Sequence, residues 1–135
     1  MKRSGILGPI LDLPPRSWVL LTVVGIFAII CSSLLPDFDT IGRSFKVVVW
    51  FFHKCGHFVG YMGLTYFLIR SFNSMDLRSK TTAFILATVF GILNEFIQYF
   101  VPGRDYAVRD MFIDAAGSLA MILLLHTSLF KTWRP

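Results

Sequence analysis

The chain has 135 residues, of which 55% are hydrophobic and only 16% are charged, and its mean hydropathy is +0.65. A soluble domain usually carries roughly 25% charged residues, so this composition excludes an ordinary water-soluble globular domain and indicates a protein embedded in lipid. The net charge of +5 does not indicate a nucleic-acid partner. The Lys and Arg residues stand mainly in short segments between apolar runs, as topology signals do.

Four apolar runs follow one another along the chain, over residues 18–35, 47–69, 81–101 and 108–129. Each has about the 17 to 25 residues that a membrane-spanning helix needs. The segments between them are short and rich in turn-forming residues. We therefore predict an all-α fold: a single domain over residues 1–135, built as an integral membrane bundle of four transmembrane helices.

Lys and Arg are distributed unevenly between the two sides of such a bundle. The N-terminal segment, the second loop with its edges and the C-terminal tail hold eight of these residues, whereas the first and third loops hold four. Because positive charge favours the cytoplasmic side, we expect both termini in the cytoplasm. The chain is then a multi-pass protein of the cytoplasmic membrane, with the first and third loops outside.

Polar side chains interrupt the last three runs at helical spacing. Residues three, four or seven positions apart share one face of a helix, so each of these helices presents one polar stripe. Ionisable residues inside a membrane segment are candidates for a functional site. The stripes contain Lys54, His57 and Tyr61; Gly91, Glu95 and Gln98; and Asp110, Asp114, Gly117 and Met121.

The three stripes also lie at one depth. With a rise of ~1.5 Å per residue, Lys54 lies roughly 10 Å below the outer end of its helix, and Glu95 and Asp114 lie roughly 9 Å below theirs. These side chains therefore converge in the outer third of the membrane. We predict one polar pocket that opens outward beneath the loop over residues 102–109, where Arg104 and Arg109 supply two further cations.

Within this pocket, His57 and Glu95 are the predicted catalytic residues, because an imidazole and a carboxyl can transfer protons. His53, one residue before Lys54, is expected to point elsewhere, and His126 to lie near the cytoplasmic boundary. The pair Gly56-x-x-x-Gly60 predicts a face of close helix approach. The predicted ligand-binding residues are Lys54, Tyr61, Gln98, Arg104, Arg109, Asp110 and Asp114.

Metal binding is not indicated by the spacing. His57, Glu95, Asp110 and Asp114 carry groups that bind divalent metals, but they match no metal signature. The two cysteines, Cys31 and Cys55, lie inside apolar runs and form no CxxC motif. We therefore expect no metal and no other cofactor.

The polar residues also allow a purely structural interpretation. Three cations, Lys54, Arg104 and Arg109, balance the three carboxyl groups of the stripes, so an ion-pair network that joins three helices would need no ligand. Against this stands the cost of burying charges, several kcal/mol per ion before pairing. Small residues alone can join membrane helices.

The polar residues follow one another in a fixed order with fixed gaps: Lys54-x-x-His57-Phe58-x-x-Tyr61-x-x-Leu64, then Glu95-x-x-Gln98-x-Phe100-x-Pro102-x-Arg104, then Asp110-x-x-x-Asp114-x-x-Gly117. This order resembles the VanZ-like family of small bacterial membrane proteins, over roughly residues 50–120. The family usually has Asn where this chain has Asp114. A buried carboxyl that keeps its proton donates and accepts hydrogen bonds somewhat as Asn does, so we expect Asp114→Asn to be nearly silent and Asp114→Leu to be damaging.

The resemblance implies a bacterial protein linked to the cell envelope or to the response to glycopeptide antibiotics, without an agreed reaction. One hypothesis is a site, enzymatic or not, for an anionic lipid-linked or peptidoglycan-related ligand at the outer leaflet, surrounded by membrane lipid. The second is a proton or small-solute pathway, which would need an oligomer. The third is a structural or regulatory subunit of an envelope enzyme. Whether the chain is an enzyme stays open at this point.

Overall fold

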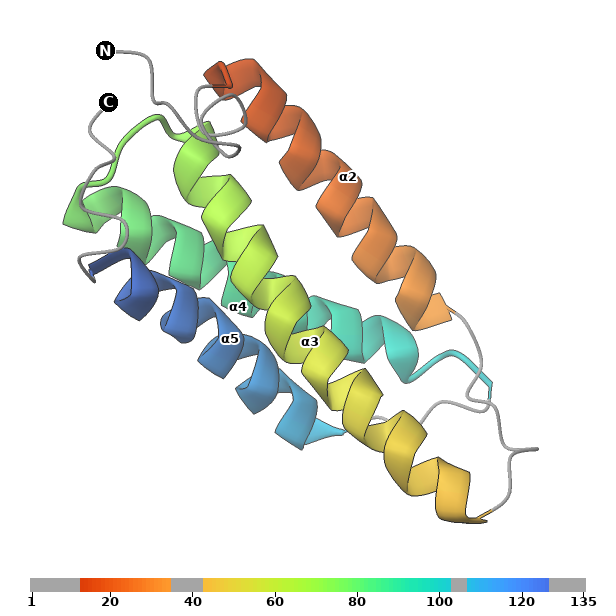
Figure 1. Cartoon of the computed structure of the whole chain (residues 1–135). Coiled ribbons are helices and arrows are strands. Elements are labelled where there is room, and N and C mark those ends of the chain that lie inside the picture. Colours follow the sequence, from red (N-terminus) through yellow and green to blue (C-terminus); the bar gives the residue numbers. More distant parts are fainter. Residues whose placement is uncertain (1–12, 35–42, 103–106, 127–135) are drawn as a thin grey trace.

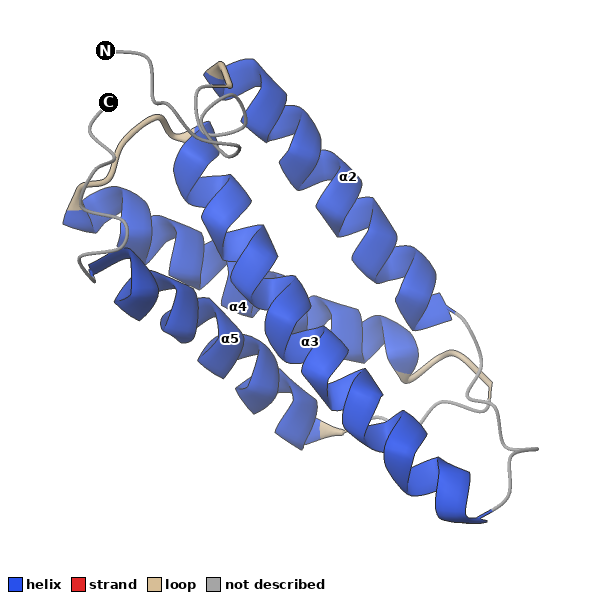
Figure 2. Ribbon diagram, viewed as in Figure 1, coloured by secondary structure: helices blue, strands red, loops and turns tan. Residues whose placement is uncertain are grey.

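The computed structural model describes residues 13–34, 43–102 and 107–126, and all regular structure in these residues is helical (Figure 2). The helices are α2 (Pro15–Leu34), α3 (Arg43–Ser71), α4 (Leu77–Gln98) and α5 (Val108–His126). The all-α prediction is confirmed. α3 and α4 begin four residues before their apolar runs, because helix continues through polar flanking turns that a hydropathy argument ignores; the predicted end of the last run, at 129, lies outside the described residues.

Local sequence signals explain where the helices begin and end. Pro15 occupies the first position of α2, where its missing N–H costs no hydrogen bond. After α3, Asn73 adopts a left-handed conformation with φ of 50°, which Asn tolerates better than most residues. Asp76 then caps α4, accepting a hydrogen bond of 2.8 Å from the backbone N of Ser79. The turn between α3 and α4 is therefore encoded by its own residues.

The four helices run alternately up and down, as Figure 1 shows. The start of α2, the end of α3, the start of α4 and the end of α5 lie at one end of the bundle. α3 is the central helix: it packs most extensively against α5 and also contacts α2 and α4. A residue on α3 can thus reach side chains from every other helix.

The polarity of the bundle is the reverse of a soluble protein, in which the interior is apolar. Large apolar side chains cover its surface, among them Phe27, Phe52 and Phe112 with exposed fractions of 67%, 68% and 72%. The interior is polar. Its largest fully buried side chains are Tyr61, Ile69, Gln98, Glu95, Asn94, Thr65, Asp110, Asp114 and Ser118.

Two of the helices, α2 and α4, are long and apolar enough to cross a membrane by length and composition. α3 and α5 do not meet the same criterion. These are the helices that carry charged stripes, in positions such as Lys54 on α3 and Asp110 and Asp114 on α5. α3 and α5, which do not meet this criterion of length and hydropathy, thus supply most of the buried ionisable groups.

An aromatic contact joins α2 to α3 near the start of α2. Trp18 is buried, its ring meets Tyr66 edge to face with centroids 5.5 Å apart, and the Arg70 guanidinium lies 4.5 Å from the centroid of the Trp18 ring. Trp18 Nε1 also donates a 3.1 Å hydrogen bond to the Leu13 carbonyl. This contact anchors α2 at the end of the bundle opposite the polar cluster described below.

Close approach between α3 and α5 depends on Gly117 rather than on the predicted glycine pair. A Cβ at Gly117 would lie 2.2 Å from the backbone oxygen of Phe58, whereas a Cβ at Gly56 or Gly60 would meet nothing within 4 Å. The prediction of a close-approach face at Gly56 and Gly60 is therefore wrong. These two glycines face open space, and that space is part of the site.

Candidate functional site

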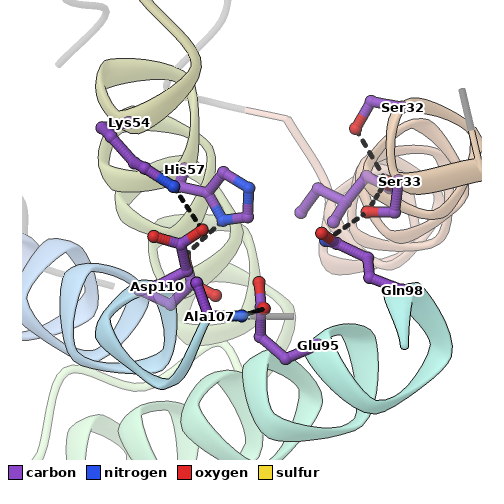
Figure 3. A network of polar contacts seen from close by, with 10 residues as sticks. Ser32, Ser33, Lys54, His57, Glu95, Gln98, Ala107 and Asp110 are labelled. Atoms are coloured by element: carbon purple, nitrogen blue, oxygen red, sulfur yellow. Dashed lines mark hydrogen bonds and ion pairs between the residues drawn. The ribbon is translucent and has the colours of Figure 1, made fainter. Parts of the chain in front are cut away.

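Three helices bring their polar stripes together in one buried group, shown in part in Figure 3. α3 supplies Lys54, His57 and Tyr61, α4 supplies Glu95, and α5 supplies Asp110 and Asp114. We call these six residues the polar cluster. Glu95 and Asp114 are fully buried, and Asp110 and Tyr61 are 2% and 1% exposed. The three polar stripes converge in the structure, as predicted. The chemical roles of these residues remain predictions.

Lys54 and Asp110 form an ion pair between α3 and α5. Lys54 Nζ lies 2.5 Å from Asp110 Oδ2, and the two side chains are 12% and 3% exposed. Because Lys54 already has a carboxylate partner, its positive charge is largely balanced within the protein. Lys54 is thus held at the edge of the cluster by Asp110.

His57 is held by a second carboxylate of α5, Asp114. His57 Nδ1 and Asp114 Oδ1 are 2.9 Å apart, with side-chain exposures of 9% and 0%. The ring of Tyr61 stacks at 13° to that of His57, and its hydroxyl lies near Asp114. A hydrogen bond at Nδ1 selects the tautomer and orientation of an imidazole. In Figure 3 the other ring nitrogen of His57 is turned toward the side on which Ser33 lies.

Glu95 faces the same group from α4. Its Oε2 accepts a hydrogen bond of 3.4 Å from the backbone N of Ala107, just before α5 begins (Figure 3). Its other oxygen, Oε1, is buried without a hydrogen-bond partner among the described residues. The Glu95 carboxyl group therefore links α4 to the start of α5, and its Oε1 atom can still accept a hydrogen bond or bind a cation.

A pocket of about 210 Å³ lies beside the polar cluster, between α2 and α3. A cavity of this size is smaller than the ~300–1,000 Å³ of pockets that enclose whole small molecules. No carboxyl group lines it. The lining residues are Ile29, Ser32, Ser33, His53, Gly56, His57, Gly60 and Tyr61.

His53 belongs to this pocket, so the prediction that it points elsewhere is wrong. Its ring meets that of His57 edge to face, with centroids 4.7 Å apart. The two histidines are four positions apart and share one helix face. The i, i+4 spacing between His53 and His57 is the sequence signal that identifies His53 as a pocket residue. The prediction missed this signal because it considered only that His53 is adjacent to Lys54.

Gln98 and Arg109 lie away from the ionisable groups. Gln98 Nε2 donates a 3.2 Å hydrogen bond to Ser33 Oγ, so it joins α4 to α2 (Figure 3). Arg109 is exposed, with its guanidinium 5.5 Å from the centroid of the Trp50 ring. The convergence of Arg109 with the buried carboxyl groups is therefore not found. Arg104 lies outside the described residues.

Sequence spacing does not single out the remaining buried polar residues near the site. Ser33 of α2 lies in a run that is mainly apolar. Asn94 is adjacent to Glu95 in the sequence and is not part of the predicted stripe of α4, which contains Gly91 and Glu95. Both are buried, with exposed fractions of 3% and 0%. His126 lies far along α5, with its Nε2 3.5 Å from Lys80 Nζ, outside the polar cluster.

Residues 14–131 match the VanZ/LLP1 protein family. No curated protein and no solved structure matches the chain. The matched range contains all four helices, the polar cluster and the pocket. The chain belongs to the VanZ/LLP1 family, as the order of its polar residues predicts.

Proposed function

We propose that this chain is a multi-pass protein of the bacterial cytoplasmic membrane that binds the headgroup of an anionic, lipid-linked molecule of the cell envelope. In this proposal all four helices cross the membrane, both termini are cytoplasmic, and the pocket between α2 and α3 faces the outer leaflet. The observation that carries it is an open pocket, lined by imidazole and hydroxyl groups, in the interior of a bundle with an apolar surface.

The reversed polarity supports four membrane spans rather than two. α3 and α5 pack against each other with their ionisable residues inward, while Phe52 of α3 and Phe112 of α5 are 68% and 72% exposed. In water such a surface would be a large apolar patch. In lipid it is the favourable arrangement, and the polar inner faces of α3 and α5 contribute to their lower hydropathy.

The lining of the pocket suits a phosphate or carboxylate headgroup. Tyr61, His53 and His57 carry O–H and N–H groups of the kind that donate hydrogen bonds to an anion, whereas the Ser32 and Ser33 hydroxyl groups donate to the Ile29 carbonyl. Among the described residues, no carboxyl group lines the pocket to repel an anion. The volume of about 210 Å³ accommodates a headgroup, whereas the lipid chain would remain in the surrounding membrane.

The same geometry suits proton transfer at the pocket wall. Asp114 holds His57 through Nδ1, which leaves the second ring nitrogen to exchange a proton with a bound ligand. Glu95 of α4, which has a carboxyl oxygen within 4.8 Å of a His57 ring nitrogen, supplies a further carboxyl group. In this proposal His57 and Glu95 keep the catalytic roles that their positions in the sequence predict.

The structural interpretation is disfavoured by the hydrogen-bond pattern. A network that serves only to join helices is stabilising when each buried polar group has a partner. Here Tyr61, Asn94, Glu95, Asp110 and Asp114 each have at least one buried polar atom without a hydrogen-bond partner among the described residues. Unused donors and acceptors beside a pocket favour a ligand.

Two glycines of α3 offer a matched test. A Cβ at Gly60 or at Gly63 meets nothing within 4 Å, but only Gly60 lines the pocket. In Gly60→Leu the new side chain fills the pocket, whereas in Gly63→Leu it does not. We expect undecaprenyl phosphate to raise the Tm of the detergent-purified wild type and of Gly63→Leu, but not of Gly60→Leu.

The neutral alcohol undecaprenol serves as the lipid control and should give a smaller shift than the phosphate. His57→Ala should also lose the phosphate-dependent shift. The proposal fails if undecaprenyl phosphate does not stabilise the wild type, or if folded Gly60→Leu responds as the wild type does.

A further inference from the structure

Three side chains of the polar cluster are arranged as metal ligands. His57 from α3, Glu95 from α4 and Asp114 from α5 each offer one ligand atom, and these atoms all lie within 4.8 Å of one another. Glu95 and Asp114 are fully buried, and the His57 side chain is 9% exposed. We propose that His57, Glu95 and Asp114 bind one divalent transition-metal ion.

The charge of the cluster supports a cation at this position. Lys54 compensates Asp110 at 2.5 Å, which leaves two carboxyl groups, Glu95 and Asp114, with one imidazole. Buried carboxylates are unfavourable unless they are paired, protonated or bound to a metal. Arg109 is exposed over Trp50 and does not compensate them. A doubly charged ion would balance both.

Unused ligand capacity points to the same place. Glu95 Oε1 and Asp114 Oδ2 are buried and have no hydrogen-bond partner among the described residues. Asp114 Oδ1 lies 2.9 Å from His57 Nδ1. Two atoms bound to one ion at about 2.0–2.2 Å are separated by such a distance. The His57–Asp114 pair therefore already has the spacing of two ligands of one ion, and Glu95 completes the set from α4.

The donor set indicates the class of ion. Imidazole favours zinc, iron, nickel or copper, and carboxylates are also good ligands of manganese. One nitrogen and two carboxylate ligands therefore favour Zn²⁺ or Mn²⁺ over Mg²⁺, which prefers oxygen ligands and water. The spacing along the sequence predicts no metal because the three ligands come from three different helices.

A second set, formed by His53, His57 and Asp110, also has ligand atoms within 4.8 Å of one another. Asp110 is already bound to Lys54 in this set, and His53 lies in the pocket wall. We therefore assign the ion to the set with Glu95 and Asp114. His53 then lies in the wall of the pocket proposed for the headgroup.

The inference deepens the proposed function, on which it rests for the role of the ion; in the metal-bound protein His57 and Glu95 act as ligands, in place of the direct proton transfer proposed for the metal-free site. An ion with three protein ligands keeps at least one open position, as catalytic metal sites do. Because His57 borders the pocket, that position is within reach of an anionic headgroup. Metal binding itself does not depend on the lipid and can be measured without it.

The test measures metal content in the intact, detergent-purified chain. After treatment with a chelator, the protein is dialysed against Zn²⁺, Mn²⁺ or Mg²⁺, and the bound metal is measured by mass spectrometry and by calorimetric titration. We expect one equivalent of Zn²⁺ or Mn²⁺ and no bound Mg²⁺ for the wild type. Failure to bind either transition metal would overturn the proposal.

Three near-isosteric variants locate the site. Glu95→Gln and Asp114→Asn should weaken the metal affinity at least ~10-fold, the lower bound seen when even outer partners of a metal site are lost. For Asp114→Asn the metal site thus predicts a loss, in contrast to the nearly silent change expected from the sequence. Asp110→Asn should bind nearly as the wild type does, because Asp110 is not a ligand. Loss of metal in folded Asp110→Asn, with retention in folded Glu95→Gln, would assign the ion to the other set.

A measurement on the wild type alone covers the case in which a variant does not fold. Pulsed electron paramagnetic resonance of the Mn²⁺-loaded protein should detect one directly bound imidazole nitrogen, and its absence would overturn the site. Metal binding without a lipid-dependent shift would refute the headgroup proposal alone. A lipid-dependent shift in a protein that binds neither Zn²⁺ nor Mn²⁺ would refute the metal site alone.

Discussion

Single residues decide how closely the helices of this bundle approach. Gly117 of α5 lies against the backbone of Phe58 on α3, and Gly91 of α4 lies against Asp114, where a Cβ would be 3.1 Å from Oδ2. Gly91 and Gly117 stand in the polar stripes of their helices. Their small size lets the ionisable side chains beside them meet across the interfaces.

Gly117→Ala is expected to destabilise the fold. The added Cβ would lie 2.2 Å from the Phe58 carbonyl oxygen, and backbone cannot move aside as a flexible side chain can. Overpacking of this kind typically costs about 1–3 kcal/mol. Unfolding in mixed micelles measures the effect, and Gly63→Ala, which meets nothing within 4 Å, is the control. Equal stability of the two variants would contradict the close approach.

The difference between Gly117 and the pair Gly56 and Gly60 shows what a short pattern cannot determine. A GxxxG spacing states that two small residues share a helix face, but not which partner that face meets. Gly56 and Gly60 face the pocket, and Gly117 faces a helix. The distinction depends on how α3 is rotated against α2 and α5.

At the scale of the element, α4 illustrates how far local signals determine a helix. Asp76 accepts hydrogen bonds from the Ser79 side chain and backbone, and these bonds hold the pKa of Asp76 below its ordinary value. The carboxylate also stands at the N-terminus of the helix, where negative charge is favourable. The position at which α4 begins can therefore be predicted from its own residues.

This pKa shift predicts a pH dependence. A depressed pKa in the folded state contributes stability above the unfolded pKa, and that contribution is lost as the pH falls through the folded value. Wild type should therefore be slightly more stable than Asp76→Asn from pH 7 to 5, and the difference should vanish below about pH 4. Thermal unfolding across this range measures it. A difference that grows in acid would refute the assignment.

At the scale of the whole molecule, the polar interior and apolar surface connect the fold to its proposed environment. α3 touches the other three helices, so its stripe with His57 can meet carboxyl groups from α4 and α5 and the hydroxyl groups of α2. A pocket built between helices is characteristic of helical bundles. The location of the pocket follows from the central position of α3.

The proposed four-span topology predicts the side of the membrane on which each turn lies. In a Cys31→Ser, Cys55→Ser background, Ser74→Cys lies between α3 and α4, and Val101→Cys follows α4. A membrane-impermeant maleimide should label Ser74→Cys only from the cytoplasmic side and Val101→Cys only from the outside. Labelling of both positions from the same side would mean that α4 does not cross, and labelling of Ser74→Cys alone in intact cells would mean that the orientation is reversed.

The sequence by itself predicts the helices, their order and the polar stripe on each of the last three, because apolar runs and the 3.6-residue period are local properties of the chain. It also predicts a common depth for Lys54, Glu95 and Asp114 in the proposed membrane arrangement. Only the tertiary structure decides which charges pair, that His53 lines the pocket and that three helices bring metal-ligand atoms within 4.8 Å. These features depend on the rotation and packing of each helix against the others, which no single segment encodes.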